Sequence, residues 1–195
     1  MDKKQDKLLY LGLRSILTVL VSLTVYSFDS QATIYGELDL VDIQQSQSPY
    51  VEYLARSVAV QIRKTSISEN RPYNSRNLRQ AMVCEDEPFI DQPVLGSCSG
   101  FLVGPQHILT AGHCYLGSGN PCAELSWVFD YTVENDRTSA FWGPKENVYN
   151  CAKVEKISYQ GDLDYALVKL DRPVAGRTPL KLSSQKQFDL GHPVF

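Results

Sequence analysis

The chain has 195 residues, of which 43% are hydrophobic and 21% charged, and its 19 Lys and Arg against 22 Asp and Glu give a formal net charge of −3. This length allows one ordinary domain, or one and a half, and excludes a large multidomain assembly. The slight negative charge argues against a partner such as nucleic acid or an anionic membrane, which basic proteins bind through bulk charge.

The N-terminal residues are typical of an export signal. Lysines within residues 1–7 and Arg14 precede an apolar, uncharged run over residues 16–28, and Ser30-Gln31-Ala32 fits a signal-peptidase site. The apolar run is shorter than the roughly 20 residues that span a bilayer, so a membrane anchor is the weaker alternative. We expect residues 1–32 to be a signal peptide, and the protein to be secreted or periplasmic with no stable membrane association after cleavage.

Export changes how the cysteines are interpreted, because disulfides persist outside the cytosol. No two of them form a C-x-x-C pair, so the spacing of a zinc knuckle or a thioredoxin-type redox site is missing. Their number is odd, so at least one cannot pair within this chain. The five are Cys84, Cys98, Cys114, Cys122 and Cys151.

Residues 33–80 are expected to form a propeptide or an N-terminal arm with one strand. Residues 33–50 are polar and acidic and predict an exposed leader. The segment 56–64 alternates apolar and polar positions, as a half-buried strand does. Residues 65–80 are polar and predict a long surface loop. The apolar positions of the strand are Val58, Val60 and Ile62.

From Ala81 onward the chain predicts more strands and no amphipathic helix of any length. Two short apolar runs are joined by Gly104-Pro105, which indicates a hairpin. There is no internal repeat. The fold class is therefore all-β and antiparallel. The expected strands cover residues 98–103, 107–110, 127–132, 148–157 and 165–170.

His113 is the best candidate for a general base among the three histidines. It lies in Thr110-Ala111-Gly112-His113-Cys114, where small residues allow a sharp turn directly after a strand. A disulfide from Cys114 to Cys98 would close a loop of about sixteen residues and stabilise the fold by roughly 3 kcal/mol. Such a link would hold the imidazole at the end of a rigid strand, where its ordinary pKa suits base catalysis at neutral pH.

A histidine base needs an anionic partner to fix its tautomer. Asp164 directly precedes the expected strand 165–170, and a carboxylate at a strand edge can approach a histidine on a neighbouring loop. Asp162 is a near neighbour, but only Asp164 is followed at once by the apolar strand. We therefore rank Asp164 first.

These segments resemble the trypsin-like serine proteases. The strings Cys98-Ser99-Gly100-Phe101-Leu102-Val103, Leu109-Thr110-Ala111-Gly112-His113-Cys114 and Asp164-Tyr165-Ala166-Leu167-Val168-Lys169-Leu170 are similar to the catalytic-histidine and catalytic-aspartate segments of that family. The resemblance implies the N-terminal barrel of a two-barrel fold over residues 81–195, with His113 as general base and then general acid, and Asp164 as the residue that orients it. Ile34-Tyr35-Gly36-Glu37 and Gly191-His192-Pro193 are more like the bacterial glutamyl-endopeptidase branch.

The resemblance also bears on the remaining candidates. Cys122 and Cys151 could pair across two loops of the barrel, which would leave Cys84 unpaired. The family uses no metal or organic cofactor, and a metal site built from cysteines and His113 is the disfavoured alternative. The expected substrate is a protein or peptide. His113 and Asp164 are called the dyad. Of the other histidines, His107 is expected to be a surface or strand residue and His192 a strand-turn residue.

The nucleophile of a serine triad has no counterpart in the sequence. No G-D-S-G-G-P or G-N-S-G-S-P string follows Asp164, and the chain stops at Phe195, before the second barrel that carries the serine in this family. We therefore expect a serine endopeptidase whose C-terminal barrel is missing and whose 195-residue chain is inactive. The alternative is a secreted, non-catalytic homologue that acts as a binding or regulatory module. The serines considered and set aside are Ser97, Ser99, Ser183 and Ser184.

Overall fold

The structure is a computed structural model that describes residues 40–68, 71–72, 76–81, 83–116, 119–133, 140–141, 145–161, 163–185 and 187. The expected signal peptide, Asp162 and His192 lie outside these residues. The chain divides into two compact units, Met1–Leu40 and Val41–Phe195, and the described helices and strands all lie in the second. Within the described ranges no helix combines the length and apolar character needed to cross a membrane.

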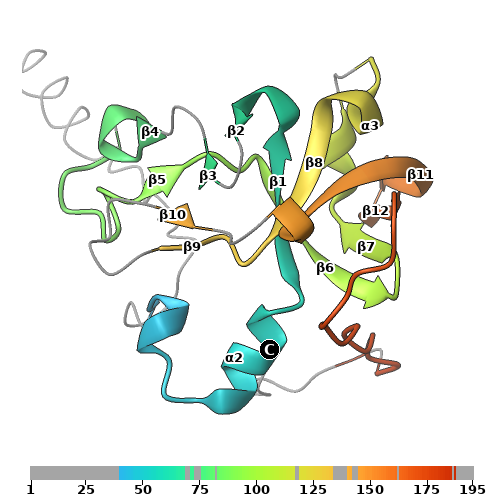
Figure 1. Cartoon of the computed structure of the whole chain (residues 1–195), viewed down its shortest axis with the longest axis horizontal. Coiled ribbons are helices and arrows are strands. Elements are labelled where there is room, and N and C mark those ends of the chain that lie inside the picture. The colour runs from blue at the N-terminus through green and yellow to red at the C-terminus, as the bar shows by residue number, and fades with distance from the viewer. Residues whose placement is uncertain are drawn as a thin grey trace, which may run out of the picture. The chain divides into compact units, whose positions relative to one another are not determined.

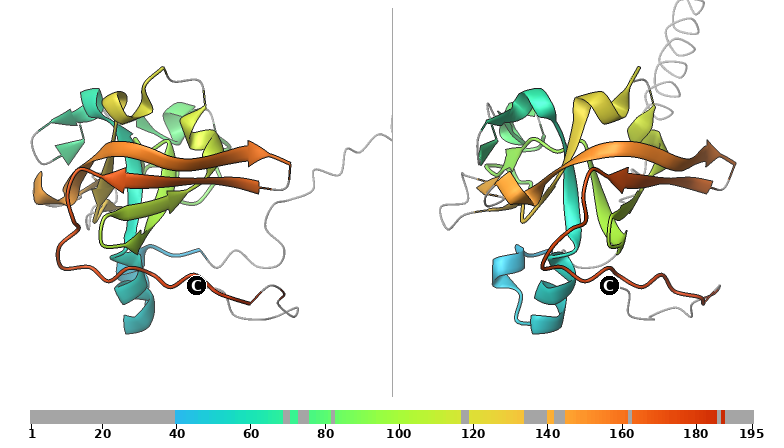
Figure 2. Two further views of the ribbon diagram at one scale, coloured as in Figure 1. Left: turned by 90° about the vertical axis from the view of Figure 1, so that its right-hand side faces the viewer. Right: turned by 45° about the vertical axis from the view of Figure 1, so that its right-hand side comes forward.

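Six antiparallel strands close into a barrel, which confirms the predicted all-β fold class (Figure 1). Their order around the barrel is β1-β6-β7-β12-β11-β8, so each strand is paired on both sides. In Figure 2 the β11–β12 hairpin runs across the molecule as one long pair of ribbons. The bounds are β1 (Val58–Arg63), β6 (Cys98–Gly104), β7 (His107–Thr110), β8 (Leu125–Phe129), β11 (Val148–Gln160) and β12 (Leu163–Leu170).

Short elements surround the barrel in the described part of the chain. The small strands form three two-stranded sheets, β2–β3, β4–β5 and β9–β10. The strands are β2 (Ile67–Ser68), β3 (Arg71–Pro72), β4 (Arg76–Asn77), β5 (Pro93–Val94), β9 (Thr132–Val133) and β10 (Ala140–Phe141); the helices are η1 (Ile43–Gln45), α2 (Pro49–Ala55), η2 (Lys64–Ser66), η3 (Arg79–Ala81), η4 (Gly112–Tyr115), α3 (Pro121–Glu124) and η5 (Lys145–Asn147).

Strand β1 is part of the barrel wall. Val60 lies opposite Ser99 of β6 on one side and opposite Val128 of β8 on the other. Removing β1 would leave the backbone hydrogen bonds of both neighbours unpaired. Strand β1, the strand predicted from the pattern of residues 56–64, is therefore an integral part of the barrel.

The core lies inside the barrel because alternate side chains of each strand point inward. Trp127, Phe129 and Ile108 are completely buried there. A second apolar cluster lies around Ile62 and Val128, on the opposite faces of β1 and β8. Strand β8 is consequently buried along its whole length.

The structure differs from the sequence prediction at several places, among them the start of β12 at Leu163, which puts Asp164 inside the strand. A helix, α2, begins at Pro49, where the Ser48 hydroxyl accepts a hydrogen bond from the Val51 N–H and proline occupies the first turn. The expected loop 65–80 contains short strands and 3-10 helices. Strand β8 ends at Phe129 because Asp130 adopts a positive φ of 56°.

The segment that follows β12, residues 171–180, is tied across the barrel and is called the strap below. Its Leu180 N–H donates to Leu102 O, and its Thr178 O accepts from the Ser57 hydroxyl. The Arg177 side chain is only 5% exposed and donates two hydrogen bonds to the Asp130 carboxylate, at 2.8 and 2.6 Å. These contacts hold the strap against the start of β1 and the end of β8.

Candidate active site

His113 lies on η4, the 3-10 turn that directly follows β7. The turn packs closely against the β11–β12 hairpin at Gly112. A Cβ at this position would overlap the carbonyl oxygen of Ser158 and lie 3.0 Å from that of Tyr165. Because both obstacles are backbone atoms, only glycine allows η4 to approach the hairpin this closely.

Two further contacts fix the base of the turn. The disulfide Cys98–Cys114 joins β6 to the residue after His113. The Thr110 hydroxyl donates a 2.7 Å hydrogen bond to Ser99 O. The imidazole is therefore attached to a turn that is anchored to two strands of the barrel.

Asp164 is the second residue of β12 and binds His113 twice. Its Oδ2 lies 2.6 Å from His113 Nδ1, and its Oδ1 accepts a 2.9 Å hydrogen bond from the His113 backbone N–H. The backbone contact fixes the carboxylate relative to η4, so the imidazole meets an acceptor whose position is already set. When Nδ1 carries the proton, it donates to Asp164 and leaves Nε2 as a proton acceptor.

Electrostatics keep this carboxylate ionised. The hydrogen bond from the His113 ring, and next the one from the His113 backbone N–H, hold the pKa of Asp164 below its ordinary value of 3.8. Asp164 is therefore an anion at neutral pH and can stabilise an imidazolium on His113.

The dyad is open to solvent on this barrel. The side chain of His113 is 62% exposed and that of Asp164 is 48% exposed. A small cavity of about 280 Å³ lies beside His113 and is walled by the Cys98–Cys114 disulfide, Leu116 and Leu125. This cavity was not foreseen from the sequence, because its walls come from four separate segments.

None of the serines considered from the sequence is hydrogen-bonded to the His113 imidazole in the part of the chain that the structure describes. Ser97 also lines the small cavity, but its hydroxyl donates to Gln61 Oε1 at 2.9 Å. Ser183 and Ser184 lie in an exposed, irregular segment. Among the residues that the structure describes, no serine hydroxyl is hydrogen-bonded to His113.

The remaining candidates lie elsewhere. His107 is at the start of β7, with Nε2 at 3.4 Å from the Glu155 carboxylate. The second disulfide, Cys122–Cys151, joins α3 to β11, and Cys84 is free and exposed. The sulfur atoms of Cys98 and Cys114 lie close to His113, but both are engaged in the disulfide and offer no thiolate to a metal.

Sequence reasoning missed a buried hydrogen bond between two aromatic side chains inside the barrel, next to η4. Trp127 Nε1 donates a 3.2 Å hydrogen bond to the hydroxyl of Tyr115, the last residue of η4. Burial raises the pKa of Tyr115, so the phenol stays neutral. An aromatic residue two positions after the histidine was visible in the sequence, but its partner is twelve residues further on and meets it only in the closed barrel.

Comparison with known families decides the relationship. The family model described as Trypsin matches residues 88–194, which is more than half of the chain and includes both His113 and Asp164. The chain belongs to the trypsin family. Proteases of the trypsin family act on proteins or peptides, and two disulfides accord with an exported member of it. Strand β1 precedes the matched range and still completes the trypsin-family barrel. A search of curated proteins finds no significant match.

Proposed function

We propose that this chain is the histidine- and aspartate-bearing barrel of an exported serine endopeptidase. One observation carries the proposal: Asp164 accepts a hydrogen bond from both the ring and the backbone of His113. A histidine buried only for structural reasons does not need an anion held at its Nδ1 side and solvent at its other side. A general base needs both.

His113 acts as general base and then as general acid. It takes the proton of a serine hydroxyl as the serine oxygen attacks the peptide carbonyl carbon, and then gives that proton to the leaving amine as the C–N bond breaks. In the second half, His113 takes a proton from water, whose oxygen attacks the acyl-enzyme, and returns the proton to the serine. Asp164 stays ionised throughout and stabilises the imidazolium.

The nucleophilic serine is supplied by polypeptide outside this chain, in the C-terminal barrel. Two observations support this assignment. No G-D-S-G-G or G-N-S-G-S string follows Asp164 in the sequence. The dyad is also more than a third exposed on this barrel, which leaves room for a serine to approach His113.

The finer assignments rest on sequence patterns. Residues 1–32 are an export signal, and residues 33–80 are an N-terminal arm that includes β1. Gly191-His192-Pro193 and Ile34-Tyr35-Gly36-Glu37 favour the glutamyl-endopeptidase branch of the family. N-terminal sequencing of the exported protein tests the first point, and an expected start at Thr33 supports it. A start beyond Val58 would contradict the arm.

The second candidate is a non-catalytic binding module. Three observations favour it: this barrel is closed, it has its own core, and it carries a large pocket lined by residues other than His113 and Asp164. The two candidates differ in whether a serine reacts at His113.

A fluorophosphonate probe separates these candidates. We expect no labelling of the 195-residue chain, and labelling when the chain is produced together with the polypeptide encoded after codon 195. His113→Ala in the longer product should abolish labelling without unfolding the protein. Labelling of the 195-residue chain alone would refute the external serine. A stop codon directly after Phe195, with no serine motif in any frame, would favour the binding module.

A further inference from the structure

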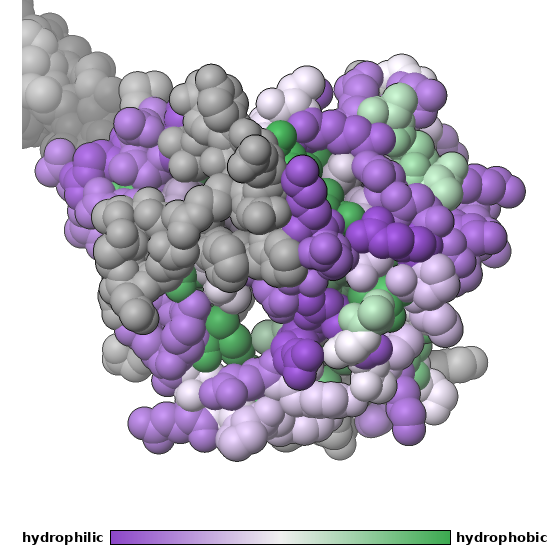
Figure 3. Space-filling view, viewed as in Figure 1, coloured by the Kyte–Doolittle hydropathy of each residue, from purple (hydrophilic) through white to green (hydrophobic). Residues whose placement is uncertain are grey.

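A large cavity lies between α2 and the outer face of the barrel. It has a volume of about 720 Å³. In Figure 3 the molecule is hollowed at this place and apolar atoms show in the hollow. This volume is within the range of small-molecule sites, which are mostly apolar and contain a few polar groups.

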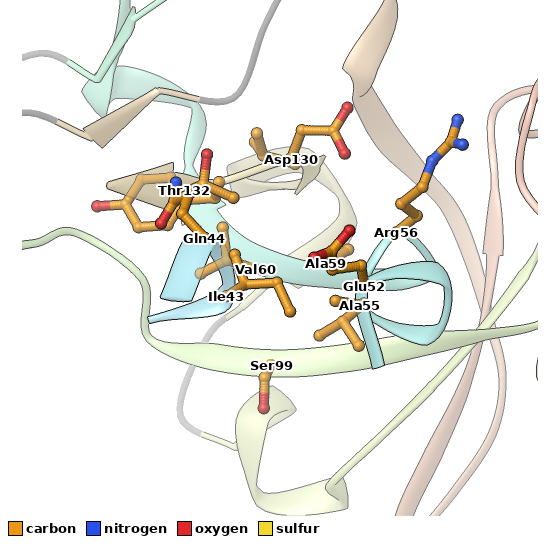
Figure 4. A pocket seen from close by; sticks show the side chains of 13 residues that line it. Ile43, Gln44, Glu52, Ala55, Arg56, Ala59, Val60, Ser99, Asp130 and Thr132 are labelled. Atoms are coloured by element: carbon orange, nitrogen blue, oxygen red, sulfur yellow. The ribbon is translucent and has the colours of Figure 1, made fainter. Parts of the chain in front are cut away.

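The walls of the cavity are chiefly aliphatic. Val58 and Val60, which lie on the same face of β1, form one side. Ala55 of α2 and Ile43 of η1 also line the cavity (Figure 4). Val58 is 43% exposed, so this apolar wall is accessible to a ligand.

Most polar groups around the cavity already have partners. The Asp130 carboxylate is bound by Arg177, and the Arg56 guanidinium donates to Gly176 O at 3.2 Å. In Figure 4 both of these charged ends point away from the middle of the cavity. The Gln44 amide donates to a backbone carbonyl, at Val133.

Among the charged side chains that line the cavity, Glu52 is the exception. Its carboxylate extends from α2 toward β1 and the middle of the cavity (Figure 4). Among the described residues it has no hydrogen bond or ion pair through its side chain. An unpaired carboxylate over an apolar wall is complementary to a cation that carries an apolar body.

We propose that this pocket binds a small ligand with an apolar body and one terminal ammonium group. The body packs against Val58 and Val60, and the ammonium donates to the Glu52 carboxylate. This site shares no residue with the dyad, so ligand binding here does not depend on whether the protein is a protease.

Titration of the full chain with hexylammonium, hexan-1-ol and hexanoate, followed by amide NMR shifts, tests the proposal. These probes share one apolar body and differ in charge. We expect hexylammonium to bind about fivefold more tightly than hexan-1-ol and hexanoate to bind most weakly. The largest shifts should be at Val58, Val60 and Thr132. Equal binding of the three probes, or shifts elsewhere, would overturn the proposal.

Two variants sharpen the test. Glu52→Gln keeps the shape of the exposed side chain and should abolish the preference, so that hexylammonium and hexan-1-ol bind about equally tightly. Glu146→Gln, an exposed carboxylate on η5, is the matched control and should retain the fivefold preference. Ala55→Trp should fill the pocket and abolish binding of all three probes. An unchanged preference in Glu52→Gln would refute the role of Glu52, whatever Ala55→Trp does.

Discussion

The Asp164 carboxylate receives the His113 ring at 2.6 Å on one oxygen and the His113 backbone N–H at 2.9 Å on the other. The two residues are 51 positions apart and are brought together because β12 pairs with β7, the strand that leads into η4. The same aspartate is therefore both an anchor for the turn and the anionic partner of the imidazole.

Asp164→Asn should change the tautomer of His113 with little change in fold. An asparagine can donate as well as accept, so it no longer requires the proton to lie on Nδ1. Imidazole ¹⁵N shifts should move from an Nδ1–H form toward a mixture, and in the complete protease kcat should fall by about 10⁴-fold. Asp86→Asn, in an exposed turn, is the control and should leave the His113 shifts unchanged.

The contribution of Asp164 to stability should disappear in acid. Because folding lowers the pKa of Asp164, the stabilisation is complete above the ordinary value of 3.8 and is lost as the pH falls through the lower, folded value. The difference in Tm between the natural chain and Asp164→Asn should be constant from neutral pH to about pH 5 and should shrink below about pH 4. A difference that grows in acid would contradict this sign.

Gly112→Ala should destabilise the barrel and displace His113. The added methyl group meets the carbonyl of Ser158, which the β11–β12 pairing holds in place, so we expect a loss of about 1–3 kcal/mol in the free energy of unfolding. Urea denaturation measures it. Gly119→Ala is the matched control, since no atom lies within 4 Å of its Cβ position, and it should change stability by less than about 0.5 kcal/mol.

Removing the Cys98–Cys114 disulfide should cost about 3 kcal/mol, because the bond closes a loop of 16 residues. The variant Cys98→Ser/Cys114→Ser measures this by urea denaturation. The His113 amide should also exchange faster with solvent, since η4 loses its link to β6. Cys84→Ser should change neither quantity, because Cys84 is free and exposed.

Arg177→Met should weaken the strap far more than a surface ion pair would. The guanidinium is nearly buried, and its loss removes two hydrogen bonds to the Asp130 carboxylate and one each to Asn147 Oδ1 and Arg56 O, so we expect about 2–4 kcal/mol of destabilisation. Arg63→Met breaks an exposed pair with Glu124 and should cost less than about 1 kcal/mol. Equal effects of the two substitutions would show that the strap is not held by Arg177.

Local signals in the sequence were sufficient for the elements nearest the dyad. Strand β7 has the predicted bounds, His107–Thr110, because its apolar residues lie between a Gly-Pro turn and the small residues of η4. Strand β11 has 13 residues, three more than predicted. Its last residues have no apolar pattern of their own, and they are held in the strand by pairing with β12. Helix α2 was missed although Ser48 and Pro49 are start signals, because they lie in a polar stretch that resembles a leader.

The sequence by itself determined the residue types of the dyad, the antiparallel strands and the cysteines that could form a disulfide, since each depends on short-range spacing. Tertiary structure decided which aspartate oxygen meets which nitrogen of His113, that β1 completes the barrel, and that Glu52 faces an apolar cavity. These relationships join segments that are far apart in the sequence, such as Ala59 and Phe129, which are 70 positions apart. They arise only when closing the barrel sets the register of every strand at once.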